Sequence, residues 1–179
     1  MTLALILTVA IGGTVAYLAT KTDSKVNTFT PSQVSCEVTE KFDGEKKTDV
    51  NVKNTSNIDA FIRVKLVTYR VNEAGQHIGG TAEIPAFAPG DGWVKYGEYY
   101  YYTKPVAPGA SPAADLISSI VLTGSYTDAD GGKQAIDVMA EAIQSVPEAA
   151  VKAAWGENFS INADGSLNVP ANGSEVTGG

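Results

Sequence analysis

One stretch, residues 60–71, alternates apolar and polar side chains through its centre and constrains the fold more than any other feature. It reads AFIRVKLVTYRV, with Ile62, Val64 and Leu66 on one parity and cationic side chains at the positions between them. Successive side chains of a β-strand point to opposite faces of the sheet. The stretch therefore predicts a long strand with one face in a core.

Arg70 falls on the apolar parity of the same stretch. A charged side chain in a core is costly unless it is paired and hydrogen-bonded. We therefore expect the strand to bulge or to leave the core before Arg70.

Shorter segments of the same kind follow one another along the chain, separated by Gly, Asp, Asn and Pro residues that favour turns. Strands are expected at 34–41, 49–53, 92–103, 116–126 and 133–146, with a last small hairpin from 159–161 and 167–169. Alanines and a glutamate make a helix a competing interpretation of 133–146. A short helix is expected at 147–155, because Pro147 suits a first helical turn and Gly156 suits a helix end.

Many short strands at close spacing with one helix near the C-terminus predict an all-β fold. The expected architecture is an antiparallel β-sandwich of the jelly-roll or immunoglobulin-like kind. The chain has 179 residues, which suits one domain. Its net charge of −7 argues against nucleic acid as a partner, because phosphate binding needs a positive surface. Cys36 is the only cysteine, so no intrachain disulfide can form, and its alternation with valines predicts a small core residue.

The N-terminus carries an apolar run over residues 2–11 that is followed by small residues. The run is shorter than the roughly 20 residues that span a bilayer, and it is typical of a secretory signal peptide. We expect cleavage between Ala16 and Tyr17; an uncleaved anchor or a first core strand are the alternatives, since no basic residue precedes the run. The predicted organisation is a signal peptide (1–16), an N-terminal arm (17–33), a β-sandwich domain (34–169) and a flexible tail (170–179).

The sequence offers little catalytic chemistry. His77 is the only histidine, which excludes a zinc site built on several histidines, and no nucleophile or phosphate-binding motif is present. Asp128 and Asp130 resemble the start of a calcium loop, but Met139 stands where the closing glutamate should be. A solvated hairpin turn is the favoured interpretation, with weak calcium binding at Asp128 and Asp130 as the alternative. We therefore expect no enzyme activity and no cofactor.

Four consecutive tyrosines, residues 99–102, are the most unusual local feature. On a strand, two rings would enter the core and two would point outward or pack under a loop. Exposed tyrosines provide rigid contact area. Trp93, Tyr100 and Tyr102 are thus a candidate binding surface, which would suit an adhesin or a carbohydrate-binding module.

The segment GGTVAYLATKTDSKVNTFTPSQV resembles the signal region of proteins processed by the SipW-type signal peptidase. The stretches VNVKNTSNIDAFIRVKL, YYYYTKPVAPG and VMAEAIQSVPEAAVKAAW are similar to the same group, the TasA/camelysin family of Gram-positive biofilm-matrix proteins. The resemblance implies a secreted jelly-roll subunit of the extracellular matrix that assembles into fibres. Its partners would be further copies of itself, related matrix subunits and the SipW-type peptidase, with membrane contact only before cleavage.

In such fibres the freed N-terminal segment of one subunit adds as a strand to the next, and the resemblance carries this role to Val26, Thr28 and Phe29. The residues agree with it: the arm is too polar to build a core alone, yet these three favour β-structure. Camelysin itself has been classed as a metallopeptidase. This chain lacks the histidine-rich motif that such chemistry needs, so a metallopeptidase ranks behind the matrix subunit and the adhesin.

Overall fold

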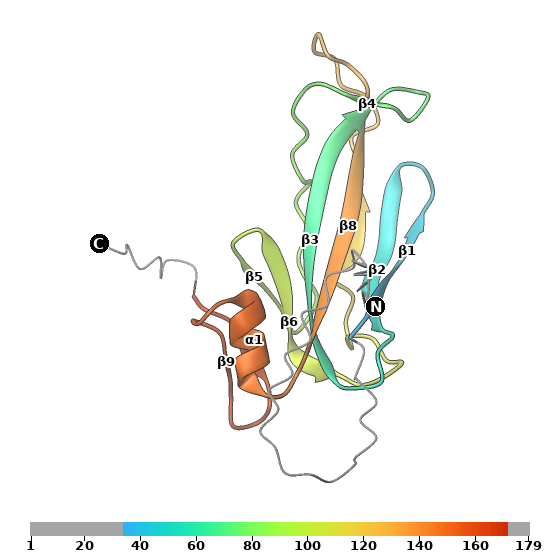
Figure 1. Cartoon of the computed structure of the whole chain (residues 1–179). Coiled ribbons are helices and arrows are strands. Elements are labelled where there is room, and N and C mark those ends of the chain that lie inside the picture. Colours follow the sequence, from blue (N-terminus) through green and yellow to red (C-terminus); the bar gives the residue numbers. More distant parts are fainter. Residues whose placement is uncertain (1–33, 172–179) are drawn as a thin grey trace, which may run out of the picture.

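The structure is a computed structural model that describes residues 34–171 (Figure 1). Its elements, in chain order, are β1 (Cys36–Phe42), β2 (Lys46–Asn54), β3 (Ala60–Val71), β4 (His77–Ile78), β5 (Trp93–Tyr96), β6 (Tyr99–Val106), β7 (Ile117–Val121), β8 (Lys133–Gln144), α1 (Glu148–Trp155), β9 (Ser160–Ile161) and β10 (Leu167–Asn168). Every pairing between these strands is antiparallel. The prediction of an all-β antiparallel fold with one short helix is confirmed.

Two sheets form the body of the molecule. The smaller sheet has the order β1-β2-β7, and the larger one is built on β3, which pairs with β8 on one side and with β6 and β4 on the other. β3 and β8 pair along their whole length, and Figure 1 shows them as the long axis of the molecule. The main core lies between the sheets and takes Val50, Val52 and Ile117 from one and Ile62 and Val64 from the other.

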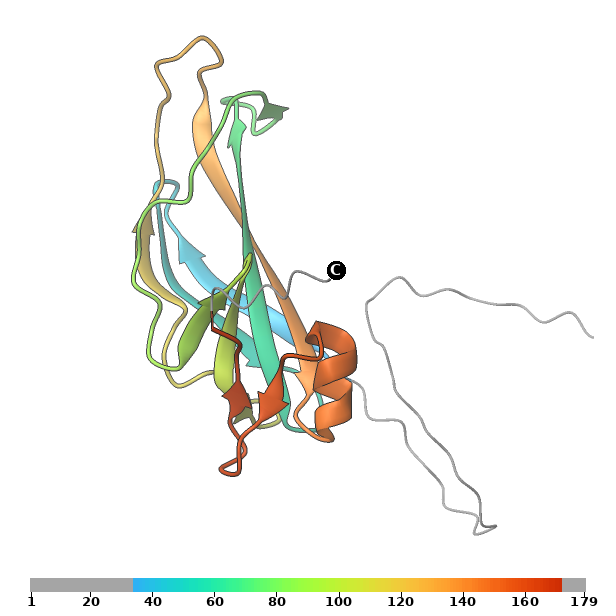
Figure 2. The same ribbon diagram turned by 90° about the vertical axis from the view of Figure 1, so that its left-hand side faces the viewer.

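A second, smaller core covers the other face of the large sheet. Phe61, Tyr101 and Ile143 of that sheet pack against Val151 of α1 and Phe159 of the following turn. Figure 2 shows α1 and β9 beside the end where β3 begins. β3 is therefore buried on both faces near its start, whereas its sequence pattern predicted burial of one face.

Residues 92–103 and 133–146 form β-structure as predicted, whereas the predicted strand at 116–126 is shorter than expected. Residues 92–103 form two strands that reverse at Gly97, whose φ of 58° suits glycine. Residues 133–146 form a strand, because pairing with β3 outweighs the helix propensity of the alanines. β7 ends at Val121, and the chain then crosses to the large sheet, where the Gln134 N–H donates to the Thr123 carbonyl over 2.8 Å.

The expectation of a bulge before Arg70 is wrong, because β3 continues through Arg70 to Val71. Arg70 is only 3% exposed. Its guanidinium binds both carboxylate oxygens of Asp128 at 2.6 and 2.7 Å and the Thr81 carbonyl at 2.7 Å. It also lies 3.6 Å from the centre of the Tyr126 ring. A buried arginine that is paired, stacked and hydrogen-bonded is tolerated on a core-facing position.

Between residues 34 and 171, no helix combines the length and the apolarity that crossing a membrane requires.

Candidate functional site

The candidate binding surface of Trp93, Tyr100 and Tyr102 is not at the surface. These side chains are 6%, 7% and 4% exposed and belong to the main core. The Trp93 indole N–H donates to the Ala114 carbonyl over 2.9 Å, and the Tyr102 hydroxyl accepts a hydrogen bond from the Ala113 N–H. The expectation that these three residues bind a ligand through exposed rings is therefore wrong.

The remaining two tyrosines of the run face the second core. Tyr101 is 3% exposed, and its ring centre lies 5.0 Å from that of Phe159 and 5.3 Å from that of Trp155. The Arg63 guanidinium stacks on Tyr99, 4.1 Å from the ring centre. The tyrosine run thus serves two cores, and the apolar Phe61 on the polar parity of its strand was the sequence signal for the second one.

Asp128 and Asp130, the weak calcium candidates, lie in the turn before β8. The Asp128 carboxylate is bound to Arg70 and also accepts the N–H groups of Asp130 and Gly131. Among residues 34–171, no three His, Cys, Asp or Glu side chains gather closely enough to hold a metal ion. Asp128 therefore acts in the structure as the partner of a buried arginine.

This ion pair predicts acid sensitivity. The hydrogen bond from Arg70 lowers the pKa of the Asp128 carboxyl from 3.8 to about 2. A carboxyl whose pKa is lower in the folded state stabilises the fold above its unfolded pKa, and the contribution is lost as the pH falls through its folded pKa. The urea midpoint of the intact protein should therefore fall more steeply between pH 4 and pH 2 than that of Asp128→Asn, with the pH window set by that lowered pKa. Parallel curves for the two proteins would contradict the prediction.

The predicted cleavage residues Ala16 and Tyr17 and the predicted donor-strand residues Val26, Thr28 and Phe29 lie outside the described residues. What the structure adds is the surface on which such a strand could dock.

That surface is the side of β8 that faces away from β3. The Gln134 N–H points away from β3, because it donates to Thr123. Backbone groups repeat their direction every second residue along a strand, and the pairing with β3 continues without interruption to Gln144. The N–H and C=O groups of Ile136, Val138, Ala140 and Ala142 therefore also point away from β3. No strand within residues 34–171 pairs with this side of β8.

Next to this edge, β1 lies beside β8, but the two strands do not pair with each other. Val138, Ala140 and Ala142 of β8 and Cys36 of β1 pack against the main core but are only partly buried, and Val38 of β1 is partly buried as well. We call these five residues the β1–β8 seam. An extended strand laid along the seam would pair with these outward-pointing backbone groups of β8 and bury apolar surface.

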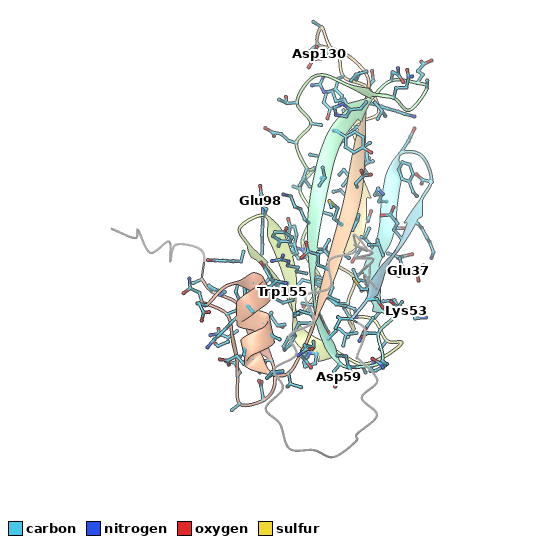
Figure 3. All side chains as sticks on the ribbon, viewed as in Figure 1. Glu37, Lys53, Asp59, Glu98, Asp130 and Trp155 are labelled. Carbon is cyan, nitrogen blue, oxygen red and sulfur yellow. The ribbon has the colours of Figure 1, made fainter. Side chains whose placement is uncertain are left out.

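β1 begins at Cys36 and lies beside β8. Burial, with a smaller contribution from the Glu141 carboxylate, raises the pKa of the Cys36 thiol from 9.0 to about 11. The thiol is therefore protonated and poorly reactive at neutral pH. Figure 3 shows Glu37 of β1 at the same end of the molecule as Asp59, with Asp130 at the opposite end.

Comparison with known proteins gives no relative. No family model, no curated protein and no solved structure matches the chain.

Proposed function

We propose that the protein is a secreted structural subunit of an extracellular matrix, and that it assembles into fibres by strand donation. The arm of residues 17–33 from one copy would add to the open edge of β8 in the next. The single observation that carries the proposal is that edge: its backbone groups between Ile136 and Ala142 point away from β3, and no described strand takes them up.

Physical chemistry supports such an edge as a docking site. An exposed strand edge is a template for pairing with another chain, and native proteins usually cover or blunt it. Strand addition supplies main-chain hydrogen bonds for affinity, while side chains that enter pockets give specificity. Val26 and Thr28 share one face of an extended arm, and Val138, Ala140 and Ala142 provide the apolar surface for them. Phe29 lies on the other face of the arm.

Removal of the leader, residues 1–16, would determine when and where the arm can be donated. While residues 1–16 stay attached, the arm is tethered at the membrane and cannot be donated. Cleavage between Ala16 and Tyr17 by a SipW-type peptidase would free the arm outside the cell. Mass spectrometry of the secreted protein, with Tyr17 expected as its first residue, checks this step.

The test compares the mature chain, residues 17–179, with a variant that lacks residues 17–30. The mature chain should form fibres visible by electron microscopy, and the variant should stay monomeric in size-exclusion chromatography. The variant keeps the seam, so a synthetic peptide of residues 17–33 should bind it with one-to-one stoichiometry, whereas a scrambled peptide of equal composition should not. Equal assembly by the variant would contradict the proposal, and so would equal binding of the two peptides.

A further inference from the structure

The two ends of the β1–β8 seam differ. At one end, which we call the basal end, the Thr55 N–H donates to the Ser35 carbonyl and the Ser145 N–H donates to the Asp59 carbonyl, each over 3.0 Å. β1 therefore begins and β8 finishes at the basal end. The other end, the distal end, is where Thr123 occupies the outer edge of β8 at Gln134.

This placement fixes where an arm leaves its own subunit. The arm immediately precedes Val34, so its C-terminal residue joins the body at the basal end. A donated arm can lie in a neighbour's seam in two directions, and each direction places the donor's body at a different end of the acceptor.

An arm that runs parallel to β8 emerges at the basal end of the acceptor. The basal ends of donor and acceptor then face each other, and the acceptor's own arm can enter the donor's seam in return. Such a reciprocal exchange is a closed twofold dimer that offers no site for a third copy.

An arm that runs antiparallel to β8 emerges at the distal end of the acceptor instead. The donor's basal end then faces the acceptor's distal end, and the same contact repeats for each added copy. A head-to-tail contact that does not close on itself builds an open filament.

We infer that the donated arm runs antiparallel to β8, from the basal to the distal end of the neighbour's seam. The inference rests on the proposed function, because only this direction gives a fibre. Antiparallel pairing is also slightly more stable per residue than parallel pairing. Pro31 fits the distal exit, since it has no N–H for the ladder and stands where Thr123 already blocks the edge of β8. Residues 31–33 then span roughly 10 Å to the donor's body.

Crosslinking between two mature chains tests the direction. Both chains carry Cys36→Ser, so that each has one engineered thiol. Donors carry Asp23→Cys or Asn27→Cys, which lie roughly 13 Å apart on an extended arm, on the face opposite Val26. Acceptors carry Asp137→Cys or Glu141→Cys, two exposed positions of β8 roughly 13 Å apart, toward the distal and the basal end. Donor and acceptor are mixed, assembled and treated with a short bismaleimide, so that a donor–acceptor product reports an intermolecular contact.

We expect position 27 to crosslink to position 137, and position 23 to position 141, each at least five-fold more than the two crossed combinations. A preference for the crossed combinations, or closed dimers in place of fibres, would overturn the inference while leaving strand donation intact. Fibres that give no crosslink at either acceptor position, 137 or 141, would show that an edge other than β8 accepts the arm. That result would also overturn the inference. Fibres formed without residues 17–30 would contradict the proposed function itself.

Discussion

Replacing Asn54 with alanine is expected to lower the free energy of unfolding by about 3 kcal/mol. Asn54 is fully buried at the end of β2. Its side-chain amide donates to the carbonyls of Ile58 and Val106, over 2.9 and 2.7 Å. Its side-chain oxygen accepts the Ser56 N–H over 2.9 Å. Alanine would leave the buried Val106 carbonyl and Ser56 N–H without this partner, and each such group costs roughly 1 to 3 kcal/mol. The Ile58 carbonyl keeps a hydrogen bond from the Ser56 hydroxyl, over 2.9 Å.

The measurement is urea denaturation of the intact protein and of two variants. Asn57→Ala is the matched control, because Asn57 lies in the same turn and is exposed; its effect should stay within about 0.5 kcal/mol. A loss below about 1 kcal/mol for Asn54→Ala would contradict the prediction, since water would then have replaced the amide at these groups.

Asn54 illustrates what could and could not be predicted from the sequence. Residues 54–57 are recognisable as a turn, and the alternation in 60–71 places β3 and its inward face correctly. Neither pattern says that the Asn54 amide bridges to Val106, which lies in another strand. Local periodicity reports which side of an element is apolar, but a long-range hydrogen bond depends on which elements become neighbours.

The predictions for Arg70 and for the tyrosine run were wrong for the same reason. A charge on an apolar parity is normally costly, and only the arrival of Asp128 and Tyr126 from a distant loop makes Arg70 acceptable there. Tyrosine occurs both in cores and on surfaces, so the sequence did not show that Tyr100 and Tyr102 are buried. They are buried because both faces of the large sheet are covered, one by the small sheet and the other by the C-terminal segment. The sequence also did not predict the outer edge of β8, which no described strand pairs with. The hydrophobic pattern of one strand does not reveal the order of the strands in a sheet.

The second large effect concerns the smaller core. Phe159→Ala is expected to lower the free energy of unfolding by about 4 kcal/mol. Phe159 is 2% exposed, and its ring packs against those of Tyr96, Tyr101 and Trp155. Alanine would remove this ring from the cluster and leave a cavity that the large sheet, which contributes Phe61, Tyr101 and Ile143, cannot close. Asn158→Ala, at the exposed neighbouring position, is the control and should change stability little.

The variant also tests whether the two cores unfold together. Phe61 and Ile62 are consecutive residues of β3 that enter opposite cores, so loss of one core should destabilise the strand that supports the other. The two tryptophans report on the cores separately, with Trp93 in the main core and Trp155 beside the second. Single-tryptophan versions, made with Trp93→Phe or Trp155→Phe, should show coincident fluorescence transitions in urea, and Phe159→Ala should move both to lower urea by the same amount. A shift of the Trp155 transition alone would mean that the C-terminal segment unfolds independently of the sandwich.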